Sequence, residues 1–447
     1  MTKWGNASVR LRSIAFLLSS LAPFSHNPAI AFAPTIYPSS PSSPAALPTF
    51  ASDPTIDALM VARGGAPIWF RGPGSSVAIE KLIAILRRAP LDGFPSGPRL
   101  ADQISTAVRD AQSGDVAAIN LADRRLSSAW LAYVAALDGG ASELTYADPS
   151  LVIKGTRTSV TLMKLASAAS LPDHLETVSA VNPVYAGLRD AAWTSLQRTG
   201  STPDQRLLKN LARARALPRT GRFIVVNSAT QRLTMVENGR VADSMKVIVG
   251  TPKTPTPMLA SMIWYVTRNP YWYVPTDLTQ RIVAARMQAN PNYLNVKNYK
   301  VISDFGETPT VLSPKGIDWK AVQAGKTTVY LRQLPGEGNS MGKMKFSFPS
   351  ETGVYLHDTD LRGLFTKDPR LLSNGCVRLE DAQRLGRWLM GREVTAGTGV
   401  PEEHLVLPQG VPVFLTYITA QVENGKLVFA PDVYGRDAER PTIASAS

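Results

Sequence analysis

The most reactive side chain in this sequence belongs to its one cysteine, Cys376, which lies in the run SNGCVR at 373–378. Upstream, His357 lies in the strand-like segment VYLHD at 354–358. The N-terminus has the pattern of an export signal, and an unpaired cysteine in an exported protein suggests a reactive thiol. A histidine on a neighbouring element is what a thiol nucleophile needs. These residues therefore indicate nucleophilic catalysis by Cys376 with His357 as its base.

The residues around the cysteine could also activate it. A free thiol has a pKa of about 8.5, so only a few per cent is ionised at pH 7. A helix expected from Leu379 would place partial positive charge near the sulfur. Gly375 lets the backbone turn tightly, so that amide N–H groups can point at a developing oxyanion. The alternative is that Cys376 is a small buried apolar residue and His357 a structural histidine.

A competing pattern is GNSMG at 338–342, which fits the G-x-S-x-G motif of serine hydrolases. That motif works on a turn between a strand and a helix, whereas this one follows a loop and precedes a strand-like run. The remaining histidines after residue 31, His174 and His404, have no ligand spacing with His357, so we expect no metal. Glycine motifs for phosphates or dinucleotides are absent from the sequence, and we expect no cofactor.

The elements that would position these residues fall into two parts. Over 55–220 apolar residues recur at helical spacing, which predicts an all-helical domain. From 221 to 437 strand-like segments and the turn signal Asn238-Gly239 predict a mostly β domain. Residues 276–325 read as an α-rich insertion that caps the β domain, as long insertions near a site often do. The fold class expected is therefore α+β.

The N-terminal segment predicts export. Residues 1–31 combine three basic residues, an apolar stretch over 14–24 and the small-residue site AIA at 29–31, as a secretory signal does. The apolar stretch is shorter than the ~20 residues that span a bilayer. We expect cleavage at this site, with an uncleaved inner-membrane anchor as the alternative. Residues 32–54 read as a Pro/Ser-rich linker and 438–447 as a polar tail.

The composition is basic, with a formal net charge of +13. Removal of 1–31, which contains three basic and no acidic residues, leaves 13 − 3 = +10. Such a charge favours polyanionic partners. For an exported protein we expect the carboxylates of the cell wall or anionic lipid rather than nucleic acid.

The run around Cys376, together with His357, resembles the signature of the L,D-transpeptidase catalytic (YkuD) domain. The flanking sequence is similar to the large Gram-negative, YcbB-like branch of that family. Four further stretches carry the resemblance: VIVG with PTP (247–250 and 255–257), NPYWYVP (269–275), the segment from LRQLPG to YLHDT (331–359), and the ending from 412 to 437. The helical half resembles the scaffold domain of that branch only loosely.

The resemblance implies a periplasmic enzyme that acts on peptidoglycan stem peptides. Cys376 would attack the L,D peptide bond after diaminopimelate, release D-alanine and pass the acyl group to another stem, which forms a 3-3 cross-link. His357 would act as base and then as acid, and N–H groups around Gly375 would form the oxyanion hole. Carbapenems are the expected inhibitors. The residues implied in substrate binding are Arg378, Tyr355, Trp272, Ser373 and Asn374.

The family signature often has histidine where this chain has Asn374, which leaves His357 as the histidine of the motif region. Two alternatives stay open at the level of sequence. An L,D-carboxypeptidase would use the same acyl-enzyme with water as acceptor, and a wall-binding scaffold would have an inactive site. The sequence does not identify a partner wall synthase.

Overall fold

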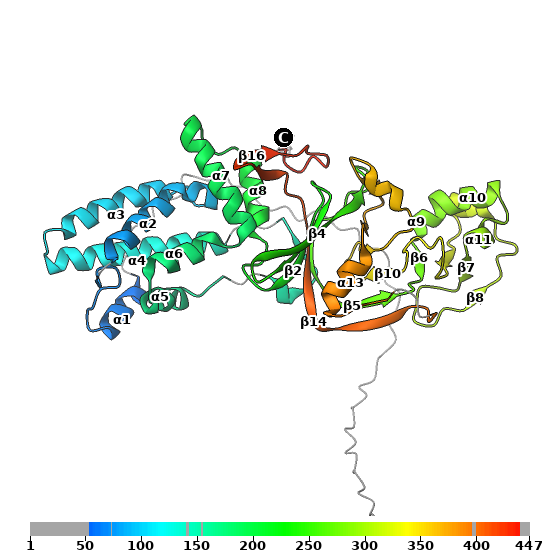
Figure 1. Cartoon of the computed structure of the whole chain (residues 1–447), viewed down its shortest axis with the longest axis horizontal. Helices are drawn as coiled ribbons and strands as arrows, with labels where there is room; N and C mark the ends of the chain where they lie inside the picture. Colours follow the sequence, from blue (N-terminus) through cyan, green and yellow to red (C-terminus); the bar gives the residue numbers. More distant parts are fainter. Residues whose placement is uncertain (1–52, 73, 140–142, 153–154, 396–398, 439–447) are drawn as a thin grey trace, which may run out of the picture. The chain divides into compact units, whose positions relative to one another are not determined.

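The computed structural model describes residues 53–72, 74–139, 143–152, 155–395 and 399–438 (Figure 1). The expected signal segment, nearly all of the expected linker and nearly all of the polar tail lie outside these residues. Within the described part of the chain, no helix has the length and apolar character needed to cross a bilayer.

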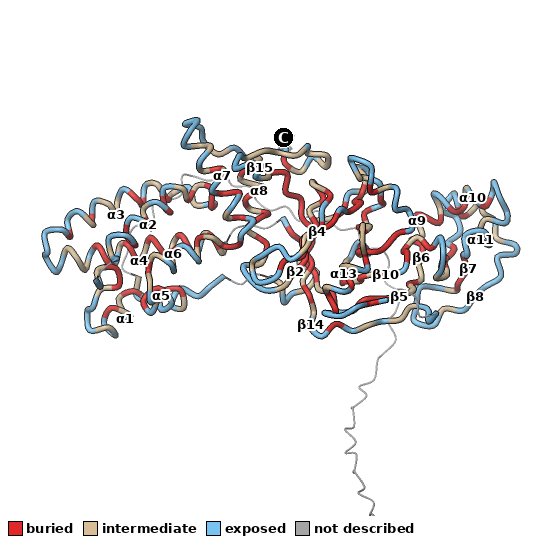
Figure 2. Tube along the Cα trace, in the orientation of Figure 1, coloured by how far each residue is buried: buried red, intermediate tan, exposed pale blue. Residues whose placement is uncertain are grey.

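The N-terminal part is helical because its apolar residues fall on one face of each helix and its helix starts are capped. Asp115, Asn182 and Asp204 each accept a hydrogen bond from a backbone N–H in the first turn that follows. The apolar faces share one core (red in Figure 2). The helices are α1 (Pro54–Ala62), α2 (Ser75–Arg88), η1 (Ala89–Asp92), α3 (Gly97–Ala111), α4 (Val116–Asp138), η2 (Pro149–Leu151), α5 (Thr158–Ser167), α6 (Leu171–Ala180), α7 (Pro183–Thr199) and α8 (Gln205–Arg215).

The C-terminal part is built on a sheet whose pairings form a closed ring. Its order is β1-β5-β10-β11-β13-β4-β3-β2-β14, β14 also pairs with β5, and β12 pairs with β4. Closure leaves few open edges. The strands are β1 (Thr145–Tyr146), β2 (Arg222–Asn227), β3 (Arg232–Glu237), β4 (Arg240–Gly250), β5 (Leu259–Arg268), β10 (Met344–Phe346), β11 (Leu356–His357), β12 (Leu371–Ser373), β13 (Val377–Leu379) and β14 (Glu403–Thr416).

Helix α13 (Ala382–Met390) packs Ala382, Leu385 and Leu389 into the core of this sheet. Asp381 caps its first turn by accepting a hydrogen bond from the Arg384 N–H. The expectation of a helix start beside the thiol is therefore wrong. Residues 377–379 form a strand that pairs with β4 on one side and β11 on the other, so the helix begins only at Ala382 and not directly after Arg378.

The insertion forms a small subdomain with its own core and its own sheet, of order β6-β9-β7-β8. Strands β6 and β9 lie outside 276–325, so the subdomain includes both flanks of the expected insertion. The elements are β6 (Trp272–Val274), α9 (Thr276–Leu278), a π-helical turn η3 (Thr279–Val283), α10 (Ala284–Ala289), α11 (Tyr293–Val296), β7 (Tyr299–Ile302), β8 (Val311–Leu312), α12 (Trp319–Gln323) and β9 (Tyr330–Gln333).

The two parts of the described chain are joined by pairing as well as by sequence. Strand β1, which comes from the helical range, pairs in parallel with the start of β5 at Leu259 and Ala260. After β14 the chain forms the hairpin β15 (Ala420–Glu423) and β16 (Lys426–Phe429). A helical part followed by a mostly β part with an insertion confirms the expected fold class.

Candidate active site

Two neighbouring strands, β11 and β13, bring the chemistry-bearing residues to one side of the sheet. In this parallel pair Leu356 lies opposite Val377, and both side chains are fully buried in the sheet core. Successive side chains of a strand alternate between faces. The residues on either side of these two apolar positions therefore share the opposite face: Tyr355 and His357 from one segment, Cys376 and Arg378 from the other.

Tyr355 lies beside both members of the expected catalytic pair. Its ring centroid is 6.0 Å from that of His357, in an edge-on arrangement. Its hydroxyl and its backbone N–H both hydrogen-bond with Cys376, which lowers the pKa of the thiol. Burial raises the pKa of the Tyr355 phenol, and a hydrogen bond with Trp272 opposes that rise. Trp272, on β6 of the inserted subdomain, is thereby connected to the cysteine through Tyr355.

His357 is held as a neutral imidazole. The side chain is 2% exposed, and Nδ1 lies 2.6 Å from the backbone oxygen of Asp358. A carbonyl oxygen can only accept, so Nδ1 carries the proton and Nε2 has its lone pair free. Burial, reinforced by the positive charge of Arg378, lowers the pKa of His357 to about 3. This is the tautomer that a general base requires.

The thiol of Cys376 is also neutral at rest. Burial raises its pKa above the ordinary value of a cysteine, while Tyr355 and the charge of Arg378 act in the opposite direction. The resting site therefore holds a neutral thiol and a neutral imidazole rather than an ion pair. Ionisation of the sulfur is expected to accompany attack on a substrate.

The turn that carries Cys376 is fixed by hydrogen bonds between its own residues. Ser373 Oγ donates to the carbonyl oxygen of Cys376 at 2.6 Å and accepts from the N–H of Gly375 at 3.1 Å. Gly375 has φ +112°, a conformation that side chains rarely tolerate. Ser373 is buried and committed to the turn, whereas Asn374 is exposed.

Arg378 acts electrostatically on the thiol of Cys376 and has no carboxylate partner among the described residues. It is half-buried, and its Nε is buried without a hydrogen-bond partner in the described structure. Lys345, which lies opposite His357 in the sheet, is instead paired with Glu402 at 3.0 Å. A partly desolvated, unpaired guanidinium is suited to bind a carboxylate in bidentate fashion.

Sequence reasoning assigned no role to several residues that the structure places around the site. Thr256 Oγ1 donates to the carbonyl oxygen of Gly375 at 2.8 Å, yet in the sequence it is one polar residue between two prolines. Lys345 and Glu402 are far apart in the chain. Thr256 and Lys345 lie in stretches that carry the family resemblance, 255–257 and 331–359, but spacing alone does not reveal which atoms they contact.

The chain matches two family models. Residues 221–429 match the L,D-transpeptidase catalytic domain (YkuD) and residues 55–191 match the Scaffold domain. The closed sheet with its Ser-Asn-Gly-Cys turn is therefore an L,D-transpeptidase catalytic domain of the YkuD family, preceded by a Scaffold domain. This confirms the family predicted from the sequence.

One curated relative and two solved structures are similar to parts of this chain. A Haemophilus influenzae protein that is provisionally named an L,D-transpeptidase is 35% identical over 242 residues, which cover 53% of this chain and 48% of the relative. The chain thus spans about half the length of that relative. A cysteine-to-serine mutant of the Enterococcus faecium L,D-transpeptidase is 16% identical over 45% of this chain and 52% of that one, with a TM-score of 0.23.

A second solved structure, an L,D-transpeptidase in complex with imipenem, is 14% identical over 44% of this chain and 58% of that one, with a TM-score of 0.21. At these identities and TM-scores the structural likeness adds nothing to the family matches.

Proposed function

We propose that this protein is an exported peptidoglycan L,D-transpeptidase that forms 3-3 cross-links through an acyl-enzyme on Cys376. The observation that carries the proposal is the shared face of β11 and β13, where a neutral imidazole with a free Nε2, a thiol and an unpaired guanidinium stand together. Together with the YkuD family match, this set suits acyl transfer to and from sulfur.

In the first half-reaction, Cys376 Sγ attacks the carbonyl carbon of the peptide bond that follows diaminopimelate in a donor stem. The thiol proton passes to His357 Nε2 as the C–S bond forms. The C–N bond then breaks, and the leaving amine of D-alanine takes the proton from the imidazole. The backbone N–H of Cys376, next to Gly375, is the candidate donor to the oxyanion of the tetrahedral intermediate.

In the second half-reaction, the side-chain amine of diaminopimelate in an acceptor stem attacks the thioester. His357 Nε2 takes a proton from this amine, the C–S bond breaks, and the sulfur recovers a proton from the imidazole. The products are a new amide and the resting enzyme, so no external reagent is consumed. Attack by water instead of the amine would give an L,D-carboxypeptidase.

Binding of a carboxylate-rich substrate would use the charge of the site. Arg378 would pair with a stem carboxylate, and Tyr355 and Trp272 would line the groove in which the peptide lies. Ser373 would act inside the turn, and Asn374, which is exposed, remains a candidate contact to substrate. The net charge of 13 − 3 = +10 that remains after removal of 1–31 supports association with the anionic wall.

The decisive experiment incubates purified tetrapeptide muropeptides with the protein and separates the products by chromatography with mass detection. We expect a 3-3 cross-linked dimer and free D-alanine from the wild type, and neither from Cys376→Ala. D-alanine without dimer would identify a carboxypeptidase. Absence of both products, together with no mass adduct on Cys376 after exposure to imipenem, would leave only the wall-binding scaffold.

Carbapenem inhibition and location are parts of the same proposal. We propose that the β-lactam carbonyl of a carbapenem acylates Cys376, which is measured as an intact adduct on the peptide that contains this residue. We also propose that the protein works in the periplasm after cleavage near residue 31. Mass measurement of the protein recovered from its membrane and periplasmic fractions would separate cleavage from an uncleaved anchor.

A further inference from the structure

The peptide unit between Gly375 and Cys376 is oriented by a side chain outside the signature run. Thr256 Oγ1 donates a hydrogen bond of 2.8 Å to the carbonyl oxygen of Gly375. In a planar trans peptide the C=O and the following N–H point in opposite directions. A fixed Gly375 carbonyl therefore fixes the direction of the Cys376 N–H, which donates to no backbone acceptor in the turns and loops of the described residues.

Thr256 can do this because its own hydroxyl is oriented. The Gly250 N–H donates to Thr256 Oγ1 at 2.9 Å, which occupies a lone pair and leaves the hydroxyl proton for the carbonyl of Gly375. The side chain is fully buried. At Gly250 an added Cβ would lie 2.1 Å from the carbonyl oxygen of Thr254, so the loop from 250 to 256 closes on itself without room for adjustment.

Both ends of that loop are held by the C-terminal segment. Tyr434 Oη donates to the carbonyl oxygen of Gly250 at 2.6 Å, and Arg436 Nη2 donates to that of Thr256 at 2.9 Å. The Tyr434 ring stacks on Tyr417 at 5.2 Å between centroids. The guanidinium of Arg436 lies 5.0 Å from the Tyr434 ring centroid.

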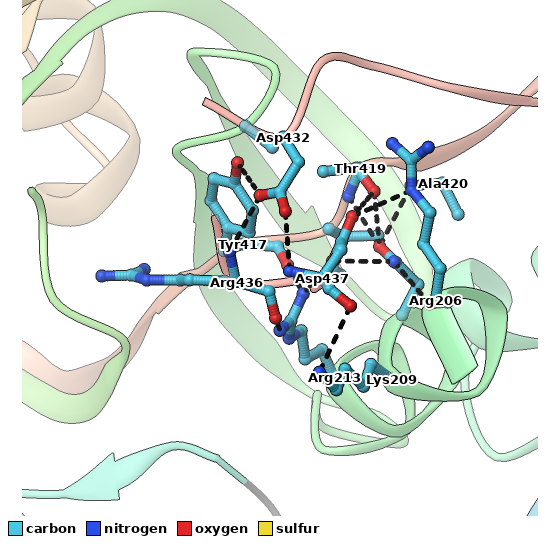
Figure 3. A network of polar contacts seen from close by, with 12 residues as sticks. Arg206, Lys209, Arg213, Tyr417, Thr419, Ala420, Asp432, Arg436 and Asp437 are labelled. Carbon is cyan, nitrogen blue, oxygen red and sulfur yellow. Dashed lines mark hydrogen bonds and ion pairs between the residues drawn. The ribbon is translucent and has the colours of Figure 1, made fainter. Parts of the chain in front are cut away.

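The segment 432–437 is in turn anchored on helix α8 (Figure 3). Asp432 accepts hydrogen bonds from the backbone N–H groups of Arg436 and Asp437, both at 2.9 Å. The Asp437 carboxylate pairs with Arg213 of α8 at 2.6 Å, and these two side chains are 3% and 1% exposed. A continuous series of contacts thus runs from a helix of the N-terminal part to the nucleophile turn.

We propose that Thr256 is a positioning residue for acyl transfer, which holds the Gly375 carbonyl so that the Cys376 N–H points at the oxyanion, and that segment 432–437 holds Thr256 in place. The inference rests on Cys376 as the nucleophile of the proposed function. Segment 432–437 lies beyond residues 221–429, which match the catalytic domain model, so the site depends on residues outside that range.

The test compares two reactions of the same sulfur. Acylation of Cys376 by 4-nitrophenyl acetate passes through a tetrahedral oxyanion, whereas alkylation by iodoacetamide displaces iodide and forms none. Both are followed by mass on the peptide that contains Cys376 in the full chain, with Cys376→Ala as the background for the first. Replacement of a residue that orients an oxyanion donor should slow acylation and leave the rate of alkylation unchanged.

We expect Thr256→Val to slow acylation by about 10- to 100-fold. This is less than the ~10²–10³-fold found when an oxyanion donor is removed, because the Cys376 N–H stays in place and only its orientation is lost. Alkylation and its pH profile should stay within about twofold of wild type, since a simple change of thiol pKa would move both reactions. Thr256→Ser, which keeps the hydroxyl, should restore acylation. The matched control is Thr416→Val, because the buried hydroxyl of Thr416 has no hydrogen-bond partner in the described structure.

Three results would overturn the inference. One is equal acylation in Thr256→Val and wild type; the second is an equal loss of acylation and alkylation; the third is wild-type acylation no faster than the Cys376→Ala background. If Thr256→Val cannot be purified in folded form, Tyr434→Phe decides, because it keeps the stacked ring and removes the bond to Gly250. Unchanged acylation in that variant would also refute the proposal. A wild type that forms no cross-links would defeat the proposed function but leave these small-molecule rates measurable.

Discussion

The neutral state of His357 leads to a direct test by titration. Burial and the charge of Arg378 lower the pKa of this imidazole from 6.5 to about 3. At about 1.36 kcal/mol for each pKa unit, that displacement corresponds to about 5 kcal/mol of preference for the neutral form. At pH 5 about 1% of the folded protein would carry imidazolium at this position, against about 97% of an imidazole with the ordinary pKa.

The direction of the effect on stability follows from proton uptake. Between pH 6.5 and about 3 the unfolded chain binds a proton at His357 and the folded chain does not. The contribution of this group to stability is therefore complete above pH 6.5 and is lost as the pH falls, by about 2 kcal/mol between pH 6.5 and 5. Unfolding in urea at pH 5 should take up about one proton more in wild type than in His357→Gln.

Two measurements check this reasoning. In histidine-labelled protein, the His357 Cε1–H resonance, assigned by its loss in His357→Gln, should not titrate between pH 5 and 8. In concentrated urea the same residue should titrate near its ordinary pKa, which serves as the control. A folded-state midpoint near 6.5, or equal proton uptake by wild type and variant, would show that the imidazole is not held neutral by burial.

Three further variants, the last with a matched control, probe other parts of the structure. Tyr355→Phe removes a hydroxyl that lowers the pKa of the thiol, so iodoacetamide should alkylate the cysteine more slowly at pH 7 and the alkylation profile should move to higher pH. Arg378→Met should raise KM for the tetrapeptide by about tenfold or more, since a hydrogen bond to a charged group is worth about 1.5–3 kcal/mol. Thermal stability should not fall, because the change removes a half-buried charge that has no carboxylate partner among the described residues. Arg213→Leu leaves the buried carboxylate of Asp437 without its closest cation and should destabilise the protein by about 3–5 kcal/mol. The control is Arg281→Leu, at an ion pair whose side chains are 53% and 63% exposed, which should cost at most about 1 kcal/mol. Equal melting temperatures for these two variants would contradict the argument from burial of the ion pair.

Local signals explain why much of the β part was predictable. Asn238-Gly239 is a two-residue turn in which both residues need positive φ, and the structure has φ 52° and 75° there. The same signal at Asn424-Gly425 joins the last hairpin, with φ 51° and 73°. The family resemblance rests likewise on a contiguous run of residues, so a single sequence is enough to locate the Ser-Asn-Gly-Cys turn.

Features that depend on distant partners were not predictable. The apolar spacing from Leu379 fits a helix, but pairing of 377–379 with strands on both sides keeps it extended and moves the helix start to Ala382. A helix pattern after Thr276 conceals the π-helical turn at 279–283. Thr256 lies in a stretch that carries the family resemblance, yet the sequence gives it no role, because the carbonyl that it contacts is more than a hundred residues away.

The pairing of β1 with β5 also bears on how this molecule can be divided. The Thr145 N–H donates to Met258 O at 3.1 Å and the Ala147 N–H to Ala260 O at 2.9 Å, so a short stretch of the Scaffold side completes a ladder of the transpeptidase side. A fragment cut at residue 221 would uncover that ladder and present bare backbone groups to other copies, a known route to aggregation. A chimera that takes its helical half from a relative would need to keep the two-residue strand β1 of the protein that supplies the sheet.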